Sequence, residues 1–303
     1  MKKKVLFAIE SLAGGGAEKI LTTLVKNIDR TKFDVTVLTV VKTGIYVEEV
    51  EKYCKIIEML PDYEKLKNPL AKMKYKMDYK KIYNEDCAKV YQKYIKDTYD
   101  VEIAFVEGFV TKLIANSTNK DSKKYAWIHT DMIKNDHADA NYESFAEHKK
   151  AYSTFDMVFA VSGYVKEVFV EKFGNEFSKK TKIQYNPVDS QEIEKSAKAS
   201  INDQYKKAVK FIAIGRFVEA KGFDRLVSSA NKLQKEGYEF EVWILGQGEG
   251  KKDIEQYIKE NQMQDYFKLK GFKENPYPYI QAADALICSS RAEGFSTVAT
   301  EAL

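Results

Sequence analysis

The sequence predicts an α/β protein with two Rossmann-like, doubly wound domains, each built on a parallel sheet. Short apolar runs suited to buried parallel strands alternate with segments whose apolar residues recur at helical spacing. This pattern begins at Val5 to Ile9 and restarts at Phe211 to Ile214, after a polar, lysine-rich and alanine-rich stretch. The length of 303 residues is sufficient for two domains. We therefore expect domains at residues 1–187 and 209–303, joined by an interdomain connection at residues 188–208.

Composition and charge exclude several classes of protein. The chain is 44% hydrophobic and 13% aromatic, which supports ordinary cores, and its net charge of +4 is small and interspersed, which argues against a nucleic-acid partner. Cys54, Cys87 and Cys288 are widely spaced within apolar patterns, so we expect reduced core thiols in a cytoplasmic protein, and neither disulfides nor zinc. Glu10 interrupts the first apolar run too early for a signal peptide or a membrane span.

A glycine-rich turn, Gly14 to Gly16, follows the first expected strand and precedes a helix. It is similar to a dinucleotide-binding fingerprint, but Lys19 occupies the third glycine position. The second expected strand, Phe33 to Val41, is followed by Lys42 rather than by an acid that could hold a ribose. Nicotinamide binding is therefore disfavoured. Two interpretations stay open: a turn whose backbone approaches a ligand closely, and a plain tight turn.

A histidine stands at the end of another expected strand of the first domain. The strand covers Lys124 to Ile128, and His129 follows it directly. Because the core ends at such a point, His129 is well placed to contact a ligand, although a strand-end histidine can also serve only as a hydrogen-bonding loop residue. Glu107 to Thr111 follows the strand Val101 to Val106 and lies on the same edge, where open α/β sheets bind ligands. This segment could touch an acceptor.

The segment Lys65–Lys81 is a basic amphipathic element. From Glu64 onward it carries seven lysines against two acids. Its apolar stripe at helical spacing consists of Leu66, Leu70, Met73 and Met77. One interpretation is a surface helix with solvated lysines and a stripe packed on the domain. The other is a surface that meets anionic lipid, because a basic face beside an apolar one is typical of helices in the membrane interface.

Candidate metal ligands do not form a set. Asp136 and His137 are adjacent, His148 stands far from both, and no Asp-x-Asp pair occurs in the sequence. We interpret these residues as parts of a loop and a helix, and we expect no bound metal.

The second domain begins with two cations at a strand-to-helix turn. Gly215, Arg216, Lys221 and Gly222 follow the strand Phe211 to Ile214. The spacing is not that of a P-loop, because no Gly-Lys-Ser/Thr ending is present. Arginine supplies a fixed fork of donors and lysine a mobile point charge, so the pair is a candidate clamp for an anion.

The stretch DALICSSRAEGFSTVATEAL closes the chain with a similar turn. Ala285 to Cys288 is an expected buried parallel strand, and a helix begins near Ser296. The N–H groups of its first turn, at Ser296 and Thr297, attract anions, so a phosphate is the expected guest. Glu293 and Glu301 bracket the turn with seven residues between them. This is the shape of a site for a sugar nucleotide.

Together these motifs resemble those of the GT4 family of glycosyltransferases. The two glutamates are similar to its Glu-x7-Glu signature, the cations to its Gly-x-Arg-x4-Lys-Gly motif, and the WIHTD context to its strand-end histidine. The resemblance implies the GT-B fold, with two Rossmann-like domains facing a cleft, and a retaining, metal-independent reaction. The catalytic residues that it implies are His129, Glu293, Arg216 and Lys221. The donor-binding residues that it implies are Gly15, Gly16, Gly294, Phe295, Ser296, Thr297 and Glu301.

The function that the resemblance implies is transfer of a sugar from a nucleoside-diphosphate sugar to a saccharide or lipid-linked acceptor, in cell-surface polysaccharide or glycolipid synthesis. The donor is a co-substrate, and no cofactor is expected. The protein would be cytoplasmic, and peripheral on the membrane if Lys65–Lys81 meets lipid. GT4 enzymes continue beyond the second glutamate, so we expect an incomplete second domain. Two alternatives remain: a sugar-nucleotide epimerase or hydrolase of the same fold, and a non-catalytic binding protein or inactive fragment.

Overall fold

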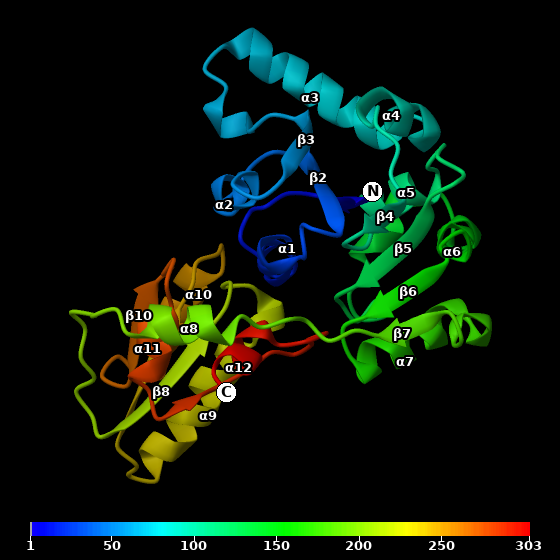
Figure 1. Ribbon diagram of the computed structural model, residues 1–303. Helices are drawn as coiled ribbons and strands as arrows, with labels where there is room; N and C mark the ends of the chain where they lie inside the picture. Colours follow the sequence, from blue (N-terminus) through cyan, green and yellow to red (C-terminus); the bar gives the residue numbers. More distant parts are fainter. Residues whose placement is uncertain (1) are drawn as a thin grey trace. The chain divides into compact units, whose positions relative to one another are not determined.

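The computed structural model describes residues 2–303 (Figure 1). The chain divides into two compact units, Met1–Pro187 and Val188–Leu303. Each is an α/β unit built on a parallel sheet, as expected from the alternation of apolar runs and helical patterns.

Unit 1 contains a seven-stranded parallel sheet with strand order β3-β2-β1-β4-β5-β6-β7. Two strand series that run outward from β1 make this the doubly wound arrangement of nucleotide-binding folds. Its strands are β1 (Lys3–Ile9), β2 (Phe33–Val41), β3 (Lys55–Leu60), β4 (Val101–Ala104), β5 (Lys123–Ile128), β6 (Met157–Ala160) and β7 (Thr181–Ile183). Its helices are α1 (Gly16–Asn27), α2 (Val47–Glu51), α3 (Pro69–Asn84), α4 (Cys87–Tyr94), α5 (Phe109–Ala115), α6 (Phe145–Ser153) and α7 (Gly163–Phe173), with 3₁₀ turns η1 (Tyr63–Lys65), η2 (His137–Asn141) and η3 (Asn175–Phe177).

Unit 2 contains a four-stranded parallel sheet with order β10-β9-β8-β11. Its strands are β8 (Val209–Ile214), β9 (Phe240–Leu245), β10 (Phe267–Gly271) and β11 (Ala285–Leu286). Its helices are α8 (Ser190–Ala197), α9 (Phe223–Lys235), α10 (Lys251–Glu260), α11 (Tyr277–Gln281) and α12 (Thr297–Glu301), with the 3₁₀ turn η4 (Glu219–Lys221).

Both faces of the unit 2 sheet are covered by helices. Successive residues of a strand point to opposite faces, so each strand contributes side chains to both. Val242 and Ile244 of β9 pack with buried residues of α9 and α10. Trp243 and Leu245 of the same strand pack on the other face with Tyr279 of α11. This two-sided burial explains why β9 is apolar at most positions and can be recognised in the sequence.

The segment 188–208, expected as an interdomain connection, forms part of unit 2. It contains α8, and the side-chain amide of Asn275 donates to the carbonyl of Ser196 at 2.9 Å. Further on, the ring of Tyr205 stacks on Trp243 with centroids 3.7 Å apart. The sequence pattern missed these contacts because few large apolar residues mark the segment.

Two expectations about burial are wrong. Ala285 and Cys288 are exposed, not buried, because β11 is a short edge strand of the described sheet. Consequently Cys288 is not a core thiol, whereas Cys87 is buried and Cys54 is partly buried. Burial raises the pKa of the Cys54 and Cys87 thiols to about 11.

The lysine-rich helix α3 differs from a packed surface helix. Of its 16 residues, Ile82 is the buried one. Leu70, Met73 and Met77 are 69%, 57% and 66% exposed, so this part of the stripe does not pack on the unit. The helix begins with Asn68, whose side chain caps the N–H of Leu70 at 2.8 Å, and with a proline in its first turn. None of the helices within residues 2–303 is both long and apolar enough to cross a bilayer.

Candidate active site

The candidate site of unit 2 is built on the carboxyl ends of two neighbouring strands. Because β8 pairs with β11, the loops that follow them lie side by side. The N–H of Arg291 donates to the carbonyl of Ala220, and the Ser289 hydroxyl donates to the carbonyl of Lys221, each at 2.8 Å. The two loops are therefore joined along their length.

Gly222 is required where these loops meet. Its φ of +62° is in the left-handed region, and a Cβ at this position would lie 2.3 Å from the carbonyl oxygen of Ser289. The guanidinium of Arg291 reinforces the junction by donating to Asp224 and to the carbonyl of Glu219, at 2.8 Å each. Close packing of the two loops therefore explains why the Gly-x-Arg-x4-Lys-Gly motif ends in a glycine, Gly222.

Lys221 and Glu293, two of the predicted catalytic residues, meet in this junction. The ammonium of Lys221 lies 2.6 Å from Oε1 of Glu293. Ser290 donates its hydroxyl to the same oxygen at 2.6 Å. Both charged side chains are partly buried, with 29% and 27% of their surfaces exposed. Ser290 is a site residue that the sequence motifs did not indicate.

Arg216 precedes Lys221 on the loop after β8 and is exposed. Its guanidinium makes no hydrogen bond or ion pair with any described residue. Its loop is fixed on the other side by the turn after β9, because the N–H of Phe217 donates to Gln247 at 2.9 Å. Gly246 permits this approach, since a Cβ there would lie 1.8 Å from the carbonyl oxygen of Gly215. The arginine is thus an available cation on a well-anchored loop.

The last helix starts where the sequence predicted. Ser296 is the N-cap of α12, and its hydroxyl accepts from the N–H of Ala299 at 3.3 Å. Gly294 and Phe295 connect this cap to Glu293, and Thr297 is the first helical residue. Glu301 ends the helix. The predicted residues 293–301 are all partly buried and continuous with the Lys221 junction.

In unit 1 the predicted residues lie at the carboxyl edge of the larger sheet. Gly15 is the N-cap of α1 and Gly16 its first residue, at the end of the loop that follows β1. His129 follows β5, two strands away in the order β1-β4-β5. Glu10, at the end of β1, accepts a hydrogen bond from the Tyr83 hydroxyl at 2.7 Å, and burial raises the pKa of its carboxyl.

Glu107, after β4, holds the end of β5. Its Oε1 accepts from the N–H groups of His129 and Thr130 at 2.6 and 2.8 Å, and from the Thr130 hydroxyl at 3.1 Å. In the segment Glu107 to Thr111, which could touch an acceptor, this oxygen of Glu107 is occupied by the main chain beside it. Burial raises the pKa of the Glu107 carboxyl, and its hydrogen bonds oppose that effect.

The ring of His129 is partly buried among aromatic side chains. It lies 5.0 Å from the ring of Phe105 and nearly parallel to Trp127, at 6.2 Å. Its Nε2 is buried and has no hydrogen-bond partner among the described residues. Burial lowers the pKa of His129 to about 4, and a hydrogen bond with the Phe105 backbone opposes this shift. The imidazole is therefore neutral at physiological pH.

The residues considered as metal ligands have other partners. His148 is 1% exposed, and its Nδ1 lies 2.8 Å from Oδ1 of Asp139. Lys172 also contacts this carboxylate, at 2.7 Å. His137 is exposed on η2. Within residues 2–303, no group of three or more histidine, cysteine, aspartate or glutamate side chains is arranged to hold a metal ion.

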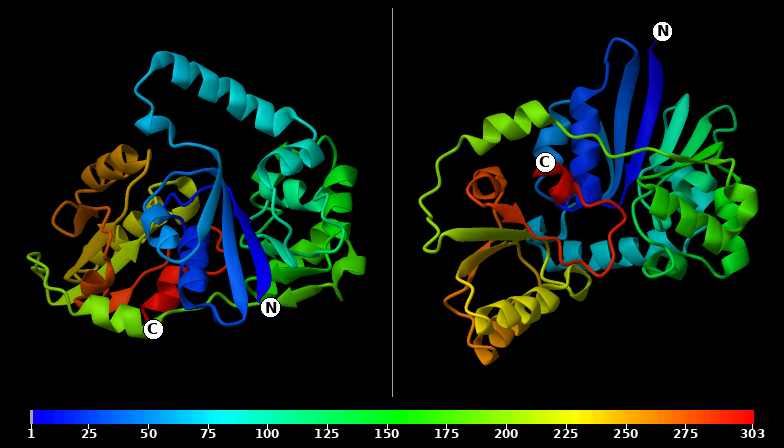
Figure 2. Two further views of the ribbon diagram at one scale, coloured as in Figure 1. Left: turned by 45° about the horizontal axis from the view of Figure 1, so that its top comes forward. Right: turned by 90° about the horizontal axis from the view of Figure 1, so that it is seen from below.

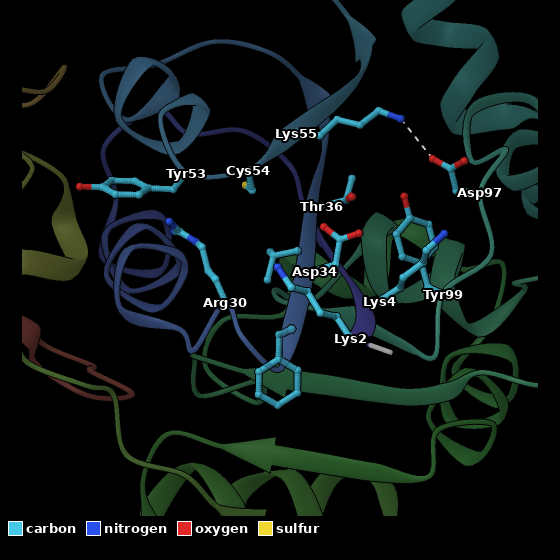
Figure 3. A pocket seen from close by; sticks show the side chains of 12 residues that line it. Lys2, Lys4, Arg30, Asp34, Thr36, Tyr53, Cys54, Lys55, Asp97 and Tyr99 are labelled. Atoms are coloured by element: carbon cyan, nitrogen blue, oxygen red, sulfur yellow. Dashed lines mark hydrogen bonds and ion pairs between the residues drawn. The ribbon is translucent and has the colours of Figure 1, made fainter.

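A cavity of about 270 Å³ lies at the opposite edge of the unit 1 sheet (Figure 3). Its walls include Lys4 and Asp34 from the starts of β1 and β2, and Tyr99 ahead of β4. An ion pair of 3.1 Å between Lys55 and Asp97 spans part of it. Open α/β sheets bind ligands at the carboxyl ends of their strands, so this cavity is not the candidate active site.

Known proteins similar to this chain are glycosyltransferases, the class whose motifs the loops of unit 2 resemble. The family model described as glycosyl transferases group 1 matches residues 194–303. Over its full length, the chain is 27% identical to N-acetylgalactosamine-N,N'-diacetylbacillosaminyl-diphospho-undecaprenol 4-alpha-N-acetylgalactosaminyltransferase of Campylobacter jejuni, of which it covers 78%.

Solved structures share the fold. HepE (Alr3699) of Anabaena, solved in complex with UDP and glucose, superposes with a TM-score of 0.72 at 18% identity, over 99% of this chain and 78% of its own. The lipopolysaccharide outer core galactosyltransferase WaaB superposes with a TM-score of 0.64 at 16% identity, over 99% and 77%. These similarities confirm the GT-B fold expected from the sequence motifs.

Proposed function

We propose that this protein transfers a sugar from a nucleoside-diphosphate sugar to a saccharide or lipid-linked acceptor, because residues 194–303 match the family model described as glycosyl transferases group 1. The biological setting would be synthesis of cell-surface polysaccharide or glycolipid. The observation that carries the proposal is the junction of Lys221 with Glu293 beside an unpaired Arg216, at the carboxyl edge where such sheets bind ligands.

The cations would hold the donor diphosphate. Arg216 offers a fork of donors with no competing partner in the described chain, and Lys221 is a mobile charge. Backbone amides from Gly294 to Thr297 would add neutral donors to the same phosphates. As the bond between sugar and diphosphate breaks, negative charge grows on the leaving oxygen, and preorganised cations stabilise it.

Donor binding would also change the partner of Glu293. In this structure its Oε1 is neutralised by Lys221 and held by Ser290. A diphosphate would draw the ammonium away, leaving the carboxylate to accept hydrogen bonds from sugar hydroxyls. Glu301 would hold the ribose, as the GT4 resemblance implies.

On unit 1, Gly15 and Gly16 would let the backbone approach the donor phosphates, and His129 would contact the donor sugar near the reaction centre. A neutral imidazole can donate one hydrogen bond and accept another without adding charge. The acceptor would attack from the face of the leaving group, with retention of configuration. We propose that no metal ion or cofactor takes part.

We also propose that the protein is cytoplasmic and binds the anionic membrane surface through Lys65–Lys81. The exposed Leu70, Met73 and Met77 lie on one stripe of α3 with exposed lysines on either side. This combination favours a helix lying in the membrane interface. The Campylobacter relative is named for a diphospho-undecaprenol substrate, which supports a lipid-linked acceptor.

The proposal is tested by calorimetric titration with UDP and GDP, followed by product analysis with the matching sugar nucleotides. We expect one diphosphate to bind, and its sugar to appear in a new glycoside with unchanged anomeric configuration. A free or epimerised sugar would identify a hydrolase or an epimerase instead. No affinity for either diphosphate in a folded sample would favour a non-catalytic protein.

A further inference from the structure

One face of α3 carries a row of aromatic rings. Tyr75, Tyr79 and Tyr83 recur at every fourth residue and therefore share one stripe of the helix. Their ring centroids are 6.2 and 4.7 Å apart in succession, and Tyr63 of η1 extends the series, 5.1 Å from Tyr75. We call these four residues the tyrosine row.

The tyrosine row crosses the carboxyl edge of the unit 1 sheet. It starts at η1, just after the carboxyl end of β3, and it ends at Tyr83. There the hydroxyl donates to Glu10 at the end of β1, and the ring lies 4.5 Å from Phe109, which follows β4. Since the strand order is β3-β2-β1-β4, the helix passes over the ends of β3, β2 and β1. Figure 2 shows it as the long cyan helix that extends across the blue strands.

The rings of the tyrosine row are not buried in the hydrophobic core of unit 1. Tyr79 is 42% exposed, and Tyr63, Tyr75 and Tyr83 are partly exposed. The row lies on the side of the helix opposite to Met73 and Met77, because residues two apart on a helix face away from each other. α3 therefore presents two different surfaces, one of thioethers and lysines and one of phenol rings.

We propose that the tyrosine row is a binding track for a chain of pyranose sugars, the saccharide portion of the acceptor. This inference rests on the proposed transferase function and names the acceptor as an oligosaccharide. A pyranose has a flat C–H face with a rim of hydroxyls, and tyrosine offers a flat apolar ring with a polar tip and few rotatable bonds. Four residues of helix advance by about 6 Å, which is similar to the length of one sugar unit.

The end of the track fits the same ligand. Glu10, which anchors Tyr83, is a carboxylate able to accept hydrogen bonds from sugar hydroxyls. Glu10 precedes the loop that leads to the glycine turn Gly14 to Gly16. This loop lies at the carboxyl edge of the unit 1 sheet, where His129 also lies. A saccharide lying along the row would thus lead its terminal sugar to the proposed acceptor side of the reaction.

The test is a printed array of defined mono- to hexasaccharides probed with the purified full chain. Binding should require several sugars, because each ring contributes a modest contact. Tyr79→Ala should weaken it by about threefold to tenfold, the range for loss of one aromatic contact, whereas Tyr79→Phe should retain it. Met77→Ala, on the opposite face of the same helix, is the matched control and should bind like the original protein. Alanine suits a helix interior, and circular dichroism checks that α3 remains folded.

Two results would overturn the inference: binding to none of the arrayed oligosaccharides, or equal binding by the Tyr79→Ala and Met77→Ala variants. Calorimetry with UDP and GDP on the same samples separates this failure from failure of the proposed function. Diphosphate binding without saccharide binding rejects the tyrosine row alone. Saccharide binding that depends on Tyr79, without diphosphate binding, supports the row and rejects the transferase.

Discussion

The ammonium of Lys221 lies 2.6 Å from the carboxylate of Glu293, although 72 residues separate them in the chain. The pairing of β8 with β11 brings their loops together, and Gly222 allows the loops to touch. A donor diphosphate would have to compete with Glu293 for Lys221, but not for Arg216. The two cations are therefore expected to contribute differently to donor binding.

Arg216→Ala and Lys221→Ala should each weaken binding of a nucleoside diphosphate by about 1.5 to 3 kcal/mol, the range for charge-assisted hydrogen bonds. The Arg216 variant should retain the contact between Lys221 and Glu293, while the Lys221 variant leaves a carboxylate near the phosphates. Calorimetry with the diphosphate and with the nucleoside alone measures both effects. The nucleoside should bind all three proteins alike. Equal losses for nucleoside and diphosphate would show that these cations do not hold phosphate.

Glu107→Ala should destabilise unit 1 and disturb His129. The change removes the acceptor of two main-chain N–H groups, and an unsatisfied buried donor costs about 1 to 3 kcal/mol. Glu107→Gln keeps an oxygen acceptor and is the matched variant. Urea unfolding and the NMR signals of the His129 ring measure the two effects. If both variants resemble the original protein in stability and in the ring signals, Glu107 does not position the strand end.

The stability of unit 1 should fall in acid because of His148. Its folded pKa of about 4 is below the unfolded value of about 6.5, so the unfolded state binds the proton more readily. The stabilising contribution is complete above about pH 6.5 and is lost as pH falls towards about 4, with an upper size of about 3 kcal/mol. His129 acts in the same direction.

His148→Gln should therefore reduce the dependence of unfolding free energy on pH, and the exposed His137→Gln is the matched control. A Trp243→Phe background leaves Trp127 as the indole reporting on unit 1, since the chain has two tryptophans. An identical pH dependence in the two glutamine variants would refute the assignment to His148.

Replacing Lys74, Lys76 and Lys80 with glutamate should abolish co-sedimentation with vesicles of acidic phospholipid. Each lysine near the surface contributes roughly 1 kcal/mol, screened over about 8 to 10 Å in ordinary salt. Lys72 is omitted because its ammonium lies over the ring of Tyr63, 4.9 Å from the centroid. Binding by the original protein should weaken steeply with salt.

The matched control for that change reverses the same number of charges elsewhere on unit 1, at the exposed Lys120, Lys150 and Lys179. It should still bind vesicles, and both variants should bind nucleoside diphosphate normally. If the original protein ignores acidic vesicles even at low salt, α3 is a solvated helix and a soluble acceptor is favoured.

Chelation by EDTA should leave transfer activity unchanged, because the described residues offer no set of ligands for a metal ion. Activity is measured before and after dialysis against the chelator. Loss of activity that manganese restores would contradict the proposed metal-independent mechanism.

Much of this fold can be predicted from the sequence because parallel strands buried on both faces give continuous apolar runs. β1 and β9 are examples, because the last five of the seven residues of β1 and all six residues of β9 are buried. The edge strand β11 shows the limit of this reasoning. The run Ala285 to Cys288, which contains β11, has the same apolar character, yet Ala285 and Cys288 are exposed, since burial depends on what lies beside the strand rather than on its own composition.

The candidate site, like the fold, could be predicted only in part from the sequence. The types and spacing of Arg216, Lys221 and Glu293 predict an anion-binding turn, but the partner of Lys221 depends on strand pairing that local spacing does not encode. Likewise, the pattern in α3 left open whether its stripe packs or is exposed. Only the placement of the helix shows that Met77 is exposed and that the tyrosines on the opposite face form a row of neighbouring rings.

The central claim is transfer of a sugar from a nucleoside-diphosphate donor through the unit 2 junction. It is tested most directly by incubating the full chain with a panel of radiolabelled UDP-sugars and GDP-sugars and a membrane extract, then counting label in glycolipid and saccharide fractions. The account predicts incorporation from a donor of one nucleotide class, lowered at least tenfold in the Arg216→Ala protein, which corresponds to about 1.4 kcal/mol. Label that stays in the donor or appears only as free sugar, or incorporation unchanged by Arg216→Ala, would contradict it.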